Sequence, residues 1–278
     1  MDRTPVNFDT VCATLHYLRN SERRPVTYML APPGGHAWET ADYGAMAVTI
    51  RNGRAAPQAP RLEREGFTLL QAPSAMTSFN DRAAIEQRYY AEMAELALAA
   101  TGASRAIVFD HLVRRRAPGS ASPFGARDGR RPGVATRVHS DYTPVSAQRR
   151  LALELDRLGI GAVARYAIVN LWRSTGLPVL DAPLAVCDAR SVGPADLVAA
   201  DIVYPDRTGE IFEVLCNPAH AWTYFHAMQF DEVLLFKQFD SDAKVARYTP
   251  HAAFEHPATP AGTPPRESIE GRCLLLYE

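Results

Sequence analysis

Several features that mark particular classes of protein are missing from this chain of 278 residues. Its four cysteines are Cys12, Cys187, Cys216 and Cys273. They lie far apart and form no C-x-x-C pair, which indicates reduced, mostly buried thiols rather than a disulfide framework. No apolar run approaches the roughly 20 residues that a membrane-spanning helix needs. The N-terminal segment also lacks the basic-then-apolar order of a signal peptide. We therefore expect a cytoplasmic protein.

The chain also lacks an excess of charge of either sign. Its formal net charge is −1, and such a balance gives no general attraction to nucleic acid or to anionic membranes. The G-x-S-x-G elbow, the Walker P-loop and the G-x-G-x-x-G fingerprint are all absent from the sequence. A hydrolase or a transferase without redox chemistry is therefore a minor alternative.

One local exception to this neutral balance is the basic run from Arg114 to Arg131. The segment that contains it, residues 114–133, is rich in arginine, glycine, proline and serine. This composition predicts a mobile loop, which could become ordered over a functional site. Alternatively, the charges of the loop attract an anionic substrate.

What the chain does contain is enough apolar sequence for one sizeable core, with 47% hydrophobic residues. We expect a single domain over residues 1–278, with peripheral strands and a helix in residues 1–104. Apolar spacing predicts helices at 81–100 and 146–158. Short strands are predicted at 28–30, 45–50, 106–109, 166–172, 184–187, 211–215, 222–225, 232–236 and 273–277. Many short strands indicate a mainly β sandwich or barrel with flanking helices outside.

The sharpest local motif is His139-Ser140-Asp141. If this motif lies in a strand, residues 139 and 141 point to the same face. An imidazole and a carboxylate then converge, as two thirds of a 2-His-1-carboxylate site that leaves positions open on Fe(II). An H-x-D motif alone is a weak signal, so a second histidine from a distant strand is needed.

The C-terminal part of the chain supplies the missing groups in a suitable order. A buried-strand pattern at 231–236 is followed by His251, then by Arg266 and Ser268. An arginine fork with a hydroxyl beside it can bind a carboxylate in a bidentate manner. If the last strand is regular, Arg272 shares a face with Arg266, so the choice of arginine stays open.

These motifs, taken together, resemble a known family. The matching stretches are FDH at 109–111, VHSDYTP at 138–144, NLWR at 170–173, PLAVCD at 183–188, NPAHAWTYF at 217–225, DEVLLFK at 231–237 and PRESIE at 265–270. Over residues 105–278 the chain resembles the hydroxylase/desaturase family that contains the cephalosporin 7α-methoxylation component and fungal desaturase-like oxygenases. The resemblance implies a double-stranded β-helix (jelly-roll) core, with Fe(II), 2-oxoglutarate as cosubstrate, and O2.

The resemblance also implies roles for individual residues. His139, Asp141 and His251 would be the catalytic metal ligands, with His220 as a rival for the place of His251. Arg266, with Ser268 near it, would bind 2-oxoglutarate. Its rivals for that role are Arg272 and Arg173. The candidates for lining the substrate pocket are Tyr142, Trp172, Trp222, Tyr224 and Lys237.

The function implied in this way is oxidation of a small molecule. The enzyme would hydroxylate or desaturate a C–H bond of a natural product, with release of succinate and CO2. The alternative is a non-catalytic partner subunit on the same fold. The expected partners are a small-molecule substrate and either a second biosynthetic enzyme or a further copy of this chain.

Overall fold

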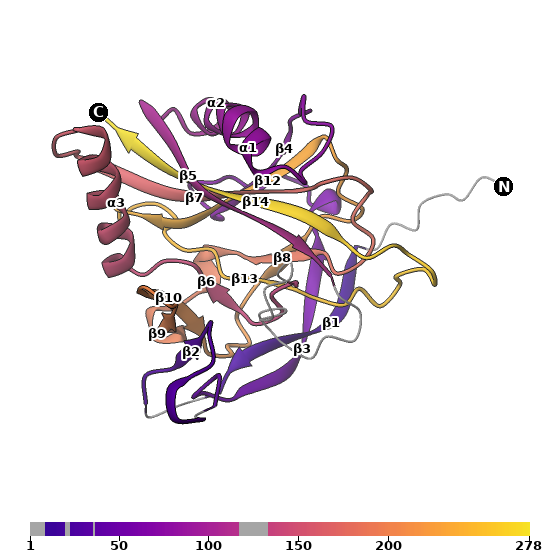
Figure 1. Ribbon diagram of the computed structural model, residues 1–278. Helices are drawn as coiled ribbons and strands as arrows, with labels where there is room; N and C mark the ends of the chain where they lie inside the picture. Colours follow the sequence, from indigo (N-terminus) through magenta and orange to yellow (C-terminus); the bar gives the residue numbers. More distant parts are fainter. Residues whose placement is uncertain (1–8, 20–22, 36, 117–132) are drawn as a thin grey trace.

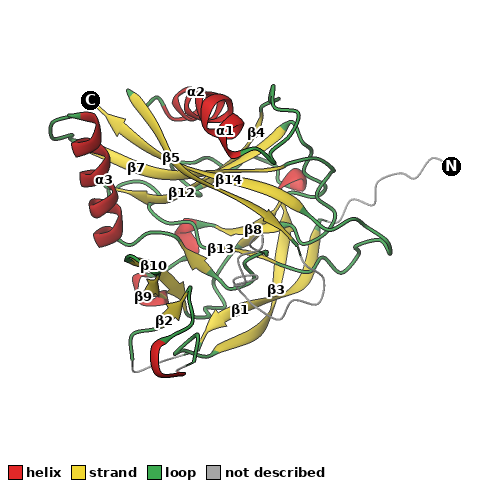
Figure 2. Cartoon of the chain, viewed as in Figure 1, coloured by secondary structure: helices red, strands yellow, loops and turns green. Residues whose placement is uncertain are grey.

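The computed structural model describes residues 9–19, 23–35, 37–116 and 133–278. Two β-sheets face each other, and the main helices pack on their outer side and at one end (Figure 1). Strands dominate the described chain (Figure 2). Within those ranges, no helix is both long enough and apolar enough to cross a membrane. The predicted mainly β fold with flanking helices and a jelly-roll core is confirmed.

The larger sheet has nine strands, most of which are short. Their order is β1 (Thr10–Leu18), β3 (Tyr43–Asn52), β11 (Trp222–Tyr224), β8 (Leu184–Cys187), β13 (His251–Ala253), β6 (His139–Ser140), β10 (Thr208–Val214), β9 (Leu197–Val203) and β2 (Val26–Tyr28). The two parallel pairings, β11 with β3 and β2 with β9, both join the N-terminal part of the chain to its later part.

The smaller sheet has five antiparallel strands. Their order is β4 (Phe67–Gln71), β12 (Glu232–Asp240), β7 (Arg165–Ser174), β14 (Glu267–Tyr277) and β5 (Arg105–Arg115). All nine residues of β12 are buried, because this strand lies between β4 and β7 and is covered on both faces. Such strands read as continuous apolar runs rather than alternating ones.

The first predicted helix forms as three consecutive pieces. These are α1 (Arg82–Ala84), a π-helical turn η3 (Ile85–Tyr89) and α2 (Tyr90–Thr101). The side chain of Asp81 accepts a hydrogen bond from the Ala83 backbone N–H, and Gly102 ends the helix at a φ of 66°. Both ends therefore carry the capping residues that their sequence positions predict.

Helix α3 (Pro144–Leu158) begins two residues earlier than expected, because Thr143 and Ser146 form a capping box around Pro144. Four short 3-10 turns complete the helical elements of the described ranges. They are η1 (Pro33–Gly35), η2 (Gly53–Ala55), η4 (Ala189–Ser191) and η5 (Pro194–Asp196).

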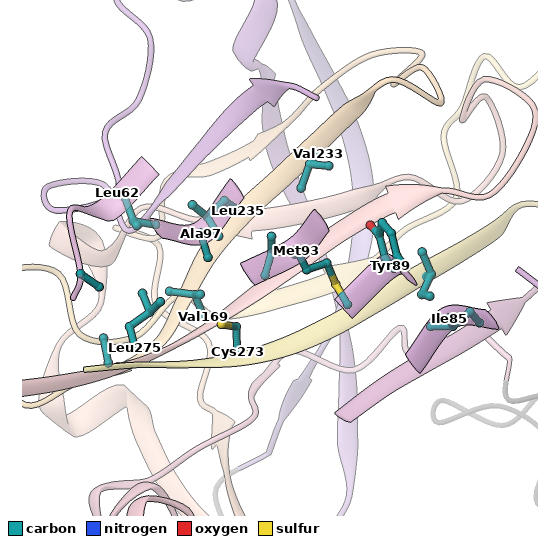
Figure 3. Packing of buried hydrophobic residues seen from close by; sticks show 14 of the residues in the cluster. Leu62, Ile85, Tyr89, Met93, Ala97, Val169, Val233, Leu235, Cys273 and Leu275 are labelled. Carbon is teal, nitrogen blue, oxygen red and sulfur yellow. The ribbon is translucent and has the colours of Figure 1, made fainter. Parts of the chain in front are cut away.

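The main hydrophobic cluster lies between α2 and the outer face of the smaller sheet (Figure 3). Tyr89, Met93 and Ala97 recur at a spacing of four and pack against alternate residues of β7 and β14, such as Val169 and Cys273. The other residues of these two strands face the opposite sheet. This alternation aims one set of side chains at the helix and the other at the interior of the molecule.

The structure corrects some expected boundaries. Arg114 and Arg115 belong to β5 rather than to a loop, because β14 supplies register partners as far as Arg115. The loop expected at 117–132 lies outside the described residues. The strand expected at 28–30 ends at Tyr28. Strands β2, β3 and β4 from the first 104 residues form pairs with later strands, so this part of the chain is built into both sheets.

We expect Gly271→Ala to destabilise the fold. An ideal Cβ at Gly271 would lie 2.1 Å from Sδ and 2.7 Å from Cε of Met93, and overpacking of this kind costs about 1–3 kcal/mol. The measurement is the free energy of unfolding in urea. Gly161→Ala is the matched control, because nothing lies within 4 Å of its Cβ position. Equal stability of the two variants would contradict the close packing of Met93 on β14.

Candidate metal centre

Strand pairing brings two histidines together. His139 in β6 is the register partner of His251 in β13, and their ring centroids lie 4.4 Å apart. Asp141 follows directly after β6. One ligand atom from each of His139, Asp141 and His251 lies within 4.8 Å of the others. Both histidines are buried, so the three groups form a compact set on the inner side of the larger sheet.

The orientation of each imidazole is set by a backbone carbonyl two residues earlier. Nδ1 of His139 lies 2.7 Å from the Arg137 carbonyl, and Nδ1 of His251 lies 3.1 Å from the Thr249 carbonyl. An Nδ1–H that donates to a carbonyl leaves Nε2 as the unprotonated nitrogen. Burial, with the neighbouring His139 ring, lowers the pKa of His251 to about 3. This imidazole is therefore neutral, as a metal ligand must be.

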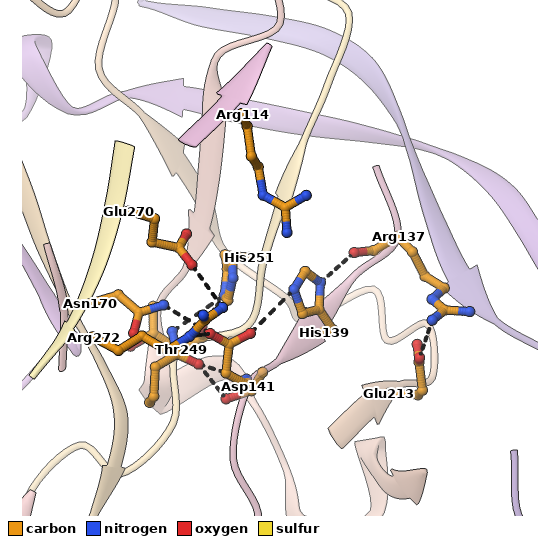
Figure 4. A network of polar contacts seen from close by, with 12 residues as sticks. Arg114, Arg137, His139, Asp141, Asn170, Glu213, Thr249, His251, Glu270 and Arg272 are labelled. Atoms are coloured by element: carbon orange, nitrogen blue, oxygen red, sulfur yellow. Dashed lines mark hydrogen bonds and ion pairs between the residues drawn. The ribbon is translucent and has the colours of Figure 1, made fainter. Parts of the chain in front are cut away.

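The two oxygens of the Asp141 carboxylate have different neighbours (Figure 4). Its Oδ2 accepts hydrogen bonds from Asn170 Nδ2 at 3.0 Å and Arg272 Nε at 2.9 Å. Its Oδ1 faces His139 Nε2 at 3.5 Å. Burial alone would raise the pKa of Asp141, but the Arg272 guanidinium brings it well below its ordinary value. The carboxylate is thus ionised, with one oxygen directed at the histidines.

Arg272 is itself surrounded by carboxylates. Besides Asp141, it contacts Asp110 at 2.9 Å and Glu270 at 3.2 Å. Burial and the nearby Asp141 raise the pKa of Glu270. Arg272 was one of the arginines considered for the cosubstrate, but its guanidinium is already engaged by these three acids. It serves as the counter-ion of the Asp141 carboxylate.

Behind His139 lies a second buried ion pair. Arg137 Nη2 is 2.9 Å from Glu213 Oε1, and both side chains are fully buried. The Arg137 guanidinium also stacks on the Tyr43 ring at 4.3 Å. Glu213 is the register partner of His139. This packing holds the short strand β6, and with it the carbonyl that orients the His139 ring.

The smaller sheet contributes polar atoms that lack partners. Arg266 directly precedes β14 and Ser268 lies within it, and both are buried. The Arg266 guanidinium lies over the Trp172 ring, 5.3 Å from the ring centroid. Neither Arg266 Nε nor Ser268 Oγ has a hydrogen-bond partner among the described residues. Burial and the nearby Arg114 lower the pKa of Arg266 to about 9. A bound carboxylate would satisfy both orphaned atoms and neutralise the positive charge.

The remaining predicted site residues lie elsewhere. Arg173 shares the outer face of β7 with Leu171, and donates to the Ala72 carbonyl at 2.7 Å beneath the first helix. His220 is held between Tyr17 Oη at 3.1 Å and Asp196 Oδ2 at 3.2 Å. The structure therefore groups His251, and not His220, with His139 and Asp141.

Three of the residues considered for the substrate pocket are engaged in packing or ion pairs. Trp222 donates to Tyr17 Oη at 2.7 Å. The hydroxyl of Tyr224 lies 3.0 Å from His256 Nε2, and Lys237 is buried between Glu63 and Asp240. Tyr142, in contrast, lines a hollow of about 370 Å³ that reaches His139 and Asp141.

Two neighbours of the metal-ligand group were not foreseen. Gln238 accepts a hydrogen bond from the Asp141 backbone N–H at 2.7 Å. It was missed because β12 continues past residue 236 through a register shift between Lys237 and Phe239. Arg114 belongs to the segment 114–133, which its composition predicts to be a loop. In a strand, residues 112, 114 and 116 point to the same face. Had the strand been extended that far from the sequence, this alternation would have placed the Arg114 side chain on the inward face.

We expect His251→Ala to lose Fe(II) binding and His220→Ala to retain it, because only His251 lies in the ligand group. The measurement is the iron content after anaerobic loading and desalting. Both variants remove a buried imidazole, so thermal unfolding checks that each is folded. A folded His220→Ala variant that loses iron would reverse the assignment of the second histidine.

Comparison with known proteins agrees with this geometry. The family model described as Oxidoreductase/YMDC permease-like domain matches residues 15–276. The hydroxylase/desaturase efuI of Hormonema carpetanum is 34% identical over 258 residues, which cover 85% of each chain. The Fe(II)/2-oxoglutarate-dependent dioxygenase nvfI of Aspergillus novofumigatus is 29% identical over 264 residues, which cover 90% of each chain.

A solved structure gives the same result for the fold. The iron and alpha-ketoglutarate-dependent endoperoxidase NvfI matches with a TM-score of 0.83 at 25% identity, over 98% of this chain and 99% of that chain. Alpha-ketoglutarate is another name for 2-oxoglutarate. Taken with the buried group of two histidines and one aspartate, these likenesses show that the chain belongs to the hydroxylase/desaturase family and is an Fe(II)/2-oxoglutarate-dependent dioxygenase.

Proposed function

We propose that His139, Asp141 and His251 hold the Fe(II), and that the enzyme hydroxylates or desaturates a C–H bond of a small natural product, with release of succinate and CO2. The observation that carries this proposal is the convergence of three ligand atoms within 4.8 Å, in a group of which His139 and Asp141 also line an open hollow. We further propose that residues 1–278 act as one domain, because strands from both parts of the chain share each sheet.

The donor set fits this metal. Two imidazoles and one ionised carboxylate on one side leave positions open for other ligands, as non-haem Fe(II) oxygenases require. When bound, the metal with 2-oxoglutarate and O2 supplies the oxidising power for an unactivated C–H bond. The protein orients the carboxylate ligand. Asn170 and Arg272 donate hydrogen bonds to one oxygen of Asp141, so that the other oxygen is available as a single ligand atom.

We assign the distal carboxylate of 2-oxoglutarate to Arg266 and Ser268. Their unpartnered buried atoms support this role. Trp172 backs the guanidinium from the other side and keeps it in place. The substrate would enter through the hollow lined by Tyr142. We assign no substrate role to Trp222, Tyr224 or Lys237, because their polar groups are engaged away from this hollow.

The test of the function is an anaerobic titration of metal-free protein, first with Fe(II) and then with 2-oxoglutarate. We expect a weak visible charge-transfer band that needs both additions, because 2-oxoglutarate would chelate the metal at its open positions. The control is succinate in place of 2-oxoglutarate, which lacks the keto group and should give no band. Protein that binds no iron and gives no band would favour the non-catalytic partner subunit.

Substitutions of Arg266, which directly precedes β14, and of Arg272 within it should have different effects in the same assay. Arg266→Ala should bind Fe(II) normally and weaken 2-oxoglutarate roughly 10- to 100-fold, the loss expected for a buried charge-assisted pair. Arg272→Ala should instead weaken Fe(II) roughly 10- to 100-fold, because it releases the Asp141 carboxylate. The two affinities are read from the same titration. Unchanged 2-oxoglutarate affinity in Arg266→Ala would contradict its role.

A further inference from the structure

The hollow beside the metal-ligand group is unusually rich in arginine. Its side chains come from β5, from helix α3, from the β9–β10 hairpin and from β14. The arginines that line it are Arg114, Arg149, Arg150, Arg207 and Arg272. The carboxylates that line it are Asp110, Asp141 and Glu210. Positive groups thus exceed negative ones on this wall, before the charge of the metal is added.

The three carboxylates are already matched by other cations. Asp110 and Asp141 both pair with Arg272. Glu210 forms an ion pair with Arg24, which is not part of the wall. Arg150 also pairs with Glu154, and Arg207 lies 3.9 Å from Asp206 in an exposed contact that water screens. The excess charge of the hollow therefore stays with Arg114, Arg149 and Arg207, and an anionic ligand would find partners there.

Within the described ranges, two of these arginines donate to backbone carbonyls and to no other group. Arg114 donates to Gly133 at 2.8 Å and Arg149 to Thr208 at 3.2 Å. Neither forms an ion pair with a carboxylate of the residues that the structure describes. The bond to Thr208 places Arg149 beside Arg207, whose guanidinium stacks on the Tyr204 ring at 4.3 Å. Arg149 and Arg207 are both exposed, at the outer rim.

Arg114 lies deeper than the rim arginines. It is the register partner of Ser268, so its side chain faces the interior between the sheets. Figure 4 shows its guanidinium directed toward the side where His139 and His251 lie. Arg114 therefore adds positive charge between the rim and the metal-ligand group. The direct contact with an anion would be made by Arg149 and Arg207 at the rim.

Several of the remaining side chains of the wall are apolar. Its apolar side chains are Met29, Leu112, Tyr142, Leu153, Ile202 and Ile211. Apolar walls with a few charged groups suit a ligand that has a hydrocarbon skeleton and one polar end. The charged end belongs at the rim, where water still reaches it, and the skeleton belongs against the apolar wall next to Asp141.

We propose that the substrate is an amphipathic carboxylate, with its acid group between Arg149 and Arg207 and its carbon skeleton directed toward the metal-ligand group. This inference rests on the proposed function and deepens it, because it names the class of molecule that is oxidised. The acid group would bind the two arginines at a distance from the reacting carbon. This contact would fix the orientation in which that carbon reaches the metal.

The experiment uses the anaerobic protein loaded with Fe(II) and saturating 2-oxoglutarate, so that the cosubstrate site is filled. The probes are 1-naphthoate and its neutral counterpart 1-naphthamide, each measured by equilibrium dialysis at low salt. We expect naphthoate to bind about tenfold more tightly, in line with charge-assisted contacts to two exposed arginines. Added salt should reduce the difference.

The test variant is Arg149→Gln/Arg207→Gln, which should bind the two probes equally. The matched control is Arg82→Gln/Arg88→Gln, which removes the same charge from exposed positions on the first helix and should keep the preference. Four outcomes would overturn the inference. They are equal binding of the two probes, no binding of either, a preference that survives in the test variant, and naphthoate binding that weakens as 2-oxoglutarate rises.

These outcomes are separable from a failure of the proposed function. The charge-transfer band with Fe(II) and 2-oxoglutarate is recorded on the same samples before any probe is added. If the band forms and naphthoate shows no preference, the enzyme stands and the substrate class is wrong. If the band never forms, the proposed metal centre itself is wrong.

Discussion

The partly buried contact between Arg272 and Asp141 is the interaction on which the arrangement of the site depends. A buried carboxylate is costly unless its charge is matched, and Arg272 matches it at 2.9 Å. Asn170, on the neighbouring strand β7, donates a second hydrogen bond to the same carboxylate. Because both bonds go to one oxygen, the other oxygen keeps its direction toward the histidines.

This contact also joins the two sheets. His139 and His251 come from the larger sheet, and Asp141 directly follows its strand β6. Arg272, Asn170 and the two residues assigned to 2-oxoglutarate come from the smaller sheet or its edge. The site is therefore complete only when the two inner faces pack together. The helix on the outer face of the smaller sheet contributes by fixing the position of β14 through Met93 and Gly271.

Much of this could be predicted from local patterns. Strand alternation places residues 139 and 141 on one side, and likewise residues 266, 268, 270 and 272. Apolar spacing predicts the bounds of both long helices to within two residues. The extent of β12 and β5 could not be predicted in this way, because their last residues are held by partners on distant strands. Gln238 and Arg114 were missed for that reason.

The sequence by itself determined the chemical inventory: an imidazole and a carboxylate two residues apart, a later histidine, and an arginine with a hydroxyl beside it. Only the tertiary structure placed one of the two candidate histidines beside His139 and Asp141, and gave the two arginines different partners. His251 lies opposite His139 because β6 and β13 are paired, while His220 is bound to Asp196. Arg272 is engaged by three carboxylates, whereas Arg266 keeps a buried nitrogen without a partner among the described residues. His139 and His251 are more than 100 residues apart in the chain, as are Asp141 and Arg272. Strand pairing brings the two histidines together, and packing of the two sheets brings Arg272 to Asp141.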